Sequence, residues 1–101
     1  MISLQETKEF LRVDGDDEDA LISSLIITAK VLVEDVLRRP LADFAVIPEP
    51  IHQAMLIVTA TLYEERQVTA ESKSGVSIKD TLDLVRRMLF AYRKSRFYLW
   101  K

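Results

Sequence analysis

The 101-residue sequence contains no cysteine, one histidine, two glycines and three prolines. Without cysteine the chain can form no disulfide framework, no thiol nucleophile and no cysteine-ligated zinc site. A single histidine leaves one chain without the ligands of a histidine-rich metal site. Scarce glycine and proline argue against a β-sandwich or barrel, because such folds need many turn residues. The composition therefore favours an all-helical protein.

Long hydrophobic runs are also missing. The longest uncharged apolar stretches, residues 20–29 and 51–63, are shorter than the roughly 18–20 residues that cross a bilayer. Residues 1–6 lack the cationic start and apolar run of a signal peptide. With 49% hydrophobic and 30% charged residues, the chain is too apolar to be disordered. We expect a soluble protein with no membrane partner, folded as a single domain over residues 1–101.

Charge is distributed unevenly along the chain, although the net value is only −2. Residues 1–35 contain three basic and nine acidic side chains, and residues 36–85 contain five and seven. Residues 86–101 contain six basic and no acidic side chains. The resulting balances of −6, −2 and +6 describe a unit with an acidic beginning and a basic end. Such polarity favours head-to-tail contacts or a docking tail.

Apolar spacing predicts about four helices in a compact bundle. Ser3 and Glu6 form a capping-box pattern for a first helix, which we expect Gly15 to end with a positive φ. Acidic residues open a second helix over residues 17–37, which has two neighbouring apolar stripes and stops before Pro40. A third helix, about residues 49–66, is apolar over most of its circumference.

The last part of the chain begins with a polar loop at residues 67–77. A second capping pattern at residues 77–80 opens a fourth helix, and the stretch from Asp80 to Tyr92 is predicted to be one continuous helix. A basic, aromatic tail follows at about residues 93–101.

Three motifs resemble the small head–tail connector proteins of tailed phages, also called DNA-packaging adaptors. The first is LRVDGDDEDALI at residues 11–22. The second is PEPIHQA at 48–54 followed by LYEER at 62–66, and the third is GV at 75–76 followed by FAYR at 90–93. The motifs occur in the family's order and span nearly the whole chain. Ala91 replaces the usual proline before the closing Tyr-Arg, and the chain continues past Arg93.

The resemblance implies an all-α subunit that forms a closed ring of many copies in the virion neck, after assembly in the host cytoplasm. Such a ring lies beneath the portal protein and extends the channel through which DNA passes without sequence-specific binding. It also presents a surface to the next neck or tail-completion protein. The resemblance implies no enzymatic reaction and no cofactor.

The acidic run is the first candidate surface, and it comprises Asp14, Asp16, Asp17, Glu18 and Asp19. A calcium loop starting at Asp14 would need a glutamate where the chain has Leu25, so a solvated helix cap is the simpler interpretation. If this surface lined a channel, its carboxylates would repel DNA phosphates and let the duplex slide.

The basic end is the second candidate surface. We expect it to dock to the portal or to a neighbouring subunit, since exposed aromatic residues with arginine favour protein interfaces. Its residues are Arg86, Arg87, Tyr92, Arg93, Lys94, Arg96, Phe97 and Trp100. The alternative is a small helical nucleic-acid-binding or regulatory protein that uses the same side chains for phosphate contacts and stacking.

Two further features have plain structural interpretations. His52 has no serine or cysteine motif as a partner, so it is interpreted as a polar surface residue rather than a catalytic base. The second and third helices are more apolar than four helices are expected to enclose, which predicts self-association through a heterologous, ring-closing contact.

Overall fold

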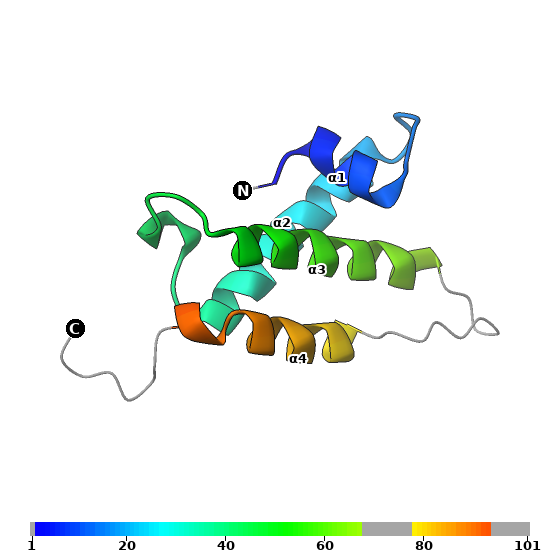
Figure 1. The fold of residues 1–101 in the computed structure, drawn as a ribbon. Coiled ribbons are helices and arrows are strands. Elements are labelled where there is room, and N and C mark those ends of the chain that lie inside the picture. The colour runs from blue at the N-terminus through cyan, green and yellow to red at the C-terminus, as the bar shows by residue number, and fades with distance from the viewer. Residues whose placement is uncertain (1, 68–77, 94–101) are drawn as a thin grey trace.

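The computed structural model describes residues 2–67 and 78–93, and these form an all-α fold. Its elements are α1 (Leu4–Leu11), α2 (Asp19–Leu37), the short 3₁₀ helix η1 (Leu41–Asp43), α3 (Glu49–Gln67), α4 (Ile78–Met88) and a second 3₁₀ helix, η2 (Phe90–Tyr92). In Figure 1, α3 and α4 run side by side, α2 crosses behind them, and α1 packs near the first turns of α2. The prediction of an all-α bundle of about four helices is confirmed.

The core lies where one apolar stripe of α2 meets α3. Of the two stripes predicted on α2, the buried one contains Ile22, Ile26, Ala29, Val33 and Leu37. The other stripe is only partly covered. Side chains from α3 and α4 complete the core, namely Ile51, Ala54, Met55, Val58 and Val85, together with Leu89 just after α4.

The central position of α3 explains its apolar circumference. It packs against α1, α2 and α4 at once, so three neighbours cover its sides. Two polar contacts bind it to α4: the Thr61 and Thr81 hydroxyls lie 2.9 Å apart, and the Glu65 carboxylate accepts the Ile78 N–H at 2.7 Å. The third helix is therefore packed against three helices of its own chain, which accounts for its apolar circumference.

The ends of α1 differ in how well the sequence predicted them. Glu6 N–H donates to Ser3 Oγ and Ser3 N–H donates to the Glu6 carboxylate, so the capping box is confirmed. Gly15, however, has no positive φ, and Arg12 takes the left-handed conformation instead with φ of 63°. The reason is that α1 already ends at Leu11, where the Arg12 and Val13 N–H groups bond back to Glu9 and Lys8.

The expected continuous helix from Asp80 to Tyr92 is also wrong. The α-helix ends at Met88, and residues Phe90–Tyr92 form a single 3₁₀ turn. This turn is held against the end of α2, because Arg93 Nε donates to the Val36 carbonyl at 2.8 Å. Tertiary contacts of the closing Tyr-Arg pair thus take precedence over local helix propensity.

Candidate functional site

The acidic run at residues 14–19, called the acidic segment from here on, is held to the rest of the molecule by one lysine and one tyrosine. Lys8 Nζ of α1 lies 3.2 Å from Asp16 Oδ1 and 2.8 Å from Asp19 Oδ1. The Tyr63 hydroxyl of α3 donates to Glu18 Oε1 at 2.5 Å. Three of the five predicted acidic residues therefore make contacts inside the chain, whereas Asp14 and Asp17 are exposed.

These contacts change the expected role of the acidic run. Glu18 is the residue immediately before α2, but its side chain makes no capping hydrogen bond. The prediction that an acidic side chain caps α2 is therefore wrong for Glu18. The carboxylates of Glu18 and Asp19 are engaged by Tyr63 and Lys8 instead. Asp19 still places negative charge in the first turn of α2, where it is favourable.

Two pKa values respond to this arrangement. The hydrogen bond to the Asp19 carboxylate raises the pKa of Lys8 above its ordinary 10.5, although desolvation works against it. The hydrogen bond to Glu18, with desolvation, raises the pKa of Tyr63 above 10.0. Both groups therefore keep their protons more firmly in the folded chain.

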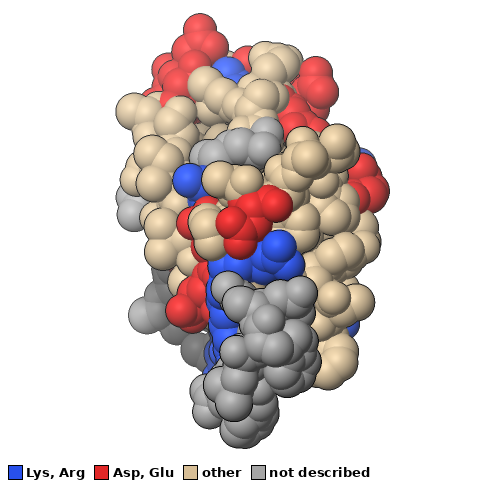
Figure 2. Space-filling model, turned by 90° about the vertical axis from the view of Figure 1, so that its left-hand side faces the viewer, with Lys and Arg blue, Asp and Glu red and all other residues tan. Residues whose placement is uncertain are grey.

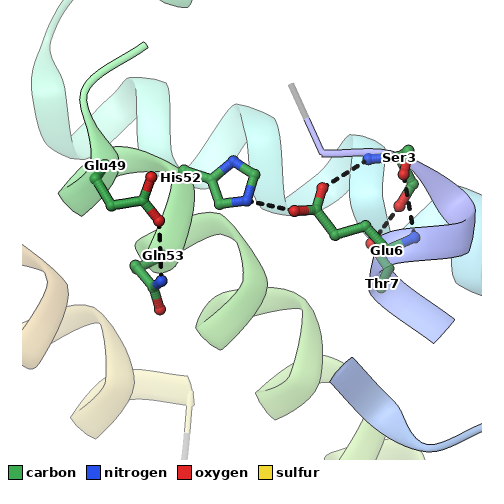
Figure 3. A network of polar contacts seen from close by, with 6 residues as sticks. All are labelled: Ser3, Glu6, Thr7, Glu49, His52 and Gln53. Carbon is green, nitrogen blue, oxygen red and sulfur yellow. Dashed lines mark hydrogen bonds and ion pairs between the residues drawn. The ribbon is translucent and has the colours of Figure 1, made fainter. Parts of the chain in front are cut away.

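His52 has a partner that lies 46 positions away in the sequence. Its Nε2 lies 2.5 Å from the Glu6 carboxylate, so the histidine joins α3 to the capping box of α1 (Figure 3). The ring is partly exposed, as expected of a surface residue, but its function in the fold is to hold α1. No local motif marks this pair.

The closing Tyr-Arg motif lies in a cluster at the other end of α2. The Tyr92 ring meets the Phe44 ring edge-on with centroids 6.4 Å apart, and the Arg39 guanidinium lies 4.5 Å from the Phe44 centroid. Arg93 satisfies the Val36 carbonyl, one of those left without a helical partner at the end of α2. Tyr92 and Arg93 thus fasten the last turn to α2.

The remaining predicted basic residues divide into two groups. Arg86 and Arg87 are exposed on α4, and Arg86 Nη1 pairs with Asp83 at 2.8 Å. Arg87 makes no ion pair with any residue in the described ranges 2–67 and 78–93. Lys94, Arg96, Phe97 and Trp100 lie outside the described residues.

One end of the molecule carries a concentration of acidic side chains on its surface. In Figure 2, acidic side chains gather at the top, the end that carries α1 and the acidic segment. Lysine and arginine side chains lie in the middle of the same face, with further acidic side chains beside them.

The described part of the chain offers little for ligand chemistry. It holds no group of three or more acidic or histidine side chains placed to bind a metal ion. A shallow hollow of about 370 Å³ beside the acidic segment is lined by Val13, Gly15, Asp17 and Glu18. Within these residues, no helix is both long and apolar enough to span a membrane. What the fold presents is helical surface of differing charge.

Comparison with known proteins identifies the family. No curated protein and no solved structure matches the chain. Residues 1–93 match the family described as phage gp6-like head-tail connector protein, a family of structural proteins rather than enzymes. The match spans all four helices, the acidic segment and the closing Tyr-Arg pair. The chain therefore belongs to the phage gp6-like head-tail connector family.

Proposed function

We propose that this chain is a single-domain subunit of a closed ring in the virion neck. The ring lies beneath the portal, extends the DNA channel and joins the head to the next neck or tail-completion protein, after assembly in the host cytoplasm. The family match over residues 1–93 is the observation that carries this proposal. The subunit acts by oligomerising and docking, and needs neither a reaction nor a cofactor.

The two charged regions take different parts in this proposal. The exposed carboxylates of Asp14 and Asp17 suit a surface near DNA, since negative charge prevents phosphates from binding and slowing the duplex. The basic end supplies a contact to the portal or to a neighbouring subunit. Within it, Arg87 is available for a partner, whereas Tyr92 and Arg93 act indirectly by positioning the last turn against α2.

Negative-stain electron microscopy of the purified protein, alone and mixed with the cognate portal, tests this function. We expect rings with a central hole in at least one of the two samples. Particles that remain monomeric by light scattering in both samples would overturn the proposal.

A gel-shift titration separates the nucleic-acid-binding alternative. A connector that lets DNA slide should bind duplex weakly at physiological salt. Tight, salt-sensitive binding by the isolated protein that is lost when Arg93, Lys94 and Arg96 are changed to alanine would favour the alternative.

A further inference from the structure

Two exposed surfaces of the chain are complementary to each other. We propose that the outer side of α2 in one copy packs against the outer side of α4 and η2 in the next copy. This inference rests on the proposed ring and names the contact that would build it. Neither surface is needed by the core of its own chain.

The outer side of α2 is apolar where solvent reaches it. Ile27 is 60% exposed and Val31 is 59% exposed, and they lie one helical turn apart. Ser24 and Thr28 beside them are exposed and uncharged. One turn further along the same stripe is Asp35, which is also exposed. The surface thus consists of two adjacent aliphatic side chains followed by one carboxylate.

The outer side of α4 and η2 also combines exposed apolar side chains with one charged side chain, and here the charge is positive. Leu84 is 41% exposed and Phe90 is 74% exposed. Arg87 lies midway between them in the sequence, three residues from each, and is also exposed. Arg87 is therefore preceded in the sequence by one exposed apolar side chain on α4 and followed by another on η2.

The charged side chains on these two surfaces include an acid on α2 and a base on α4 that have no ion-pair partner among the described residues. On α2, Lys30 Nζ lies 4.0 Å from Glu34 Oε2, and on α4 Arg86 is paired with Asp83. Asp35 and Arg87 form no ion pair with the described residues of their own chain. A contact between the two surfaces would cover the aliphatic groups and bring this carboxylate to this guanidinium.

The spacing along both helices permits both contacts together. Val31 and Asp35 are separated by about 6 Å along the α2 axis, and Leu84 and Arg87 by about 4.5 Å along α4. Packing of α2 on α2 would instead leave Leu84, Phe90 and Arg87 uncovered. If each copy uses its α2 surface toward one neighbour and its α4 surface toward the other, the contact is heterologous, and its repetition builds a ring when the rotation closes.

Thiol cross-linking tests this contact directly, because the chain has no cysteine of its own. Val31→Cys is combined with Leu84→Cys in one variant and with Phe90→Cys in another. Each is treated at high protein concentration with a short bis-maleimide and run on a denaturing gel. We expect a ladder of dimers, trimers and higher species from at least one of them. Introduction of Asp35→Arg should weaken that ladder several-fold, and adding Arg87→Asp should restore it.

Three controls decide the result. Each single-cysteine variant has one thiol per chain, so it can form cross-linked dimers but no ladder. If Val31→Cys alone gives as much dimer as the double variant gives ladder, the contact is two-fold and the proposal is overturned. Phe10→Cys with Val46→Cys, both exposed, measures random collision. A ladder no stronger than this background would also overturn it. If the contact is overturned but the wild-type protein forms rings by electron microscopy, the proposed function is still supported. Cross-linked ladders without rings would support the contact and contradict the role in the neck.

Discussion

At the scale of single residues, the molecule binds its acidic segment through long-range contacts. Lys8 is nearly covered, with 10% of its side chain exposed, while its partner Asp16 is 91% exposed. The lysine side chain is therefore packed within the fold, and the Asp16 carboxylate reaches it from the solvent side. Tyr63 acts similarly from α3 by donating to Glu18. The acidic segment is therefore anchored at two points and still presents negative charge to solvent.

The raised pKa of Tyr63 predicts a loss of stability in alkali. The folded state holds the phenol proton more tightly than the unfolded chain, so the benefit is complete below pH 10.0 and disappears as the pH rises through the folded pKa. Tyr63→Phe should lower the free energy of unfolding by about 1 kcal/mol at neutral pH. The difference from wild type should shrink above about pH 10. Urea unfolding at neutral and alkaline pH measures both, and a constant difference would contradict the assignment.

At the scale of elements, the closing Tyr-Arg pair finishes α2 and stops α4. The last carbonyls of a helix need partners from elsewhere, and Arg93 supplies one to Val36. The same contact positions Tyr92 against Phe44 and ends the regular α-helix at Met88. One pair of residues therefore determines how the final turn meets the rest of the bundle.

Arg93→Ala should therefore destabilise the chain in isolation. We expect a decrease of about 1–2 kcal/mol in the free energy of unfolding, because a charged donor is lost from a helix end. Arg87→Ala is the matched control, since Arg87 is exposed on α4 and should change stability by less than about 0.5 kcal/mol. Chemical denaturation of both variants makes the comparison. Equal midpoints would show that Arg93 has no such role.

The helix ends show which structural features can be predicted from the sequence. Capping at Ser3, the stop before Pro40 and the start of α3 at Glu49 depend on residues only a few positions apart, and they are confirmed. The end of α1 was mispredicted, although its bonds back to Lys8 and Glu9 are local, because the left-handed residue is Arg12 and not the nearby glycine. The break after Met88 was also mispredicted, because a contact across 57 positions decides it. The same limit hid the His52–Glu6 pair.

At the scale of the whole molecule, apolar surface is divided between the core and exposed faces. The sequence predicted that both central helices need a neighbour, but α3 packs against α1, α2 and α4 of its own chain. The exposed apolar side chains lie elsewhere, including Ile27 and Val31 on α2 and Leu84 on α4. Any association should therefore use these faces and leave α3 undisturbed.

Two leucines five residues apart should separate folding from association. Leu89→Ala removes a fully buried side chain and should lower the free energy of unfolding by about 2–5 kcal/mol. Leu84→Ala, on the exposed side of α4, should change monomer stability by less than about 0.5 kcal/mol and weaken assembly. Denaturation at low concentration and light scattering at high concentration measure the two effects. Unchanged assembly by Leu84→Ala would contradict its place in the contact.

The sequence by itself determined the helical class, most helix starts, the charge polarity and the family, because these depend on composition, on spacing of three to four residues and on ordered motifs. Only the tertiary structure decided which stripe of α2 is buried, that α3 is enclosed, and that Tyr92 and Arg93 are used internally. It also paired Lys8 with the acidic segment and His52 with Glu6. These outcomes depend on contacts between residues far apart in the sequence. A local sequence pattern does not specify which distant side chain a residue will contact.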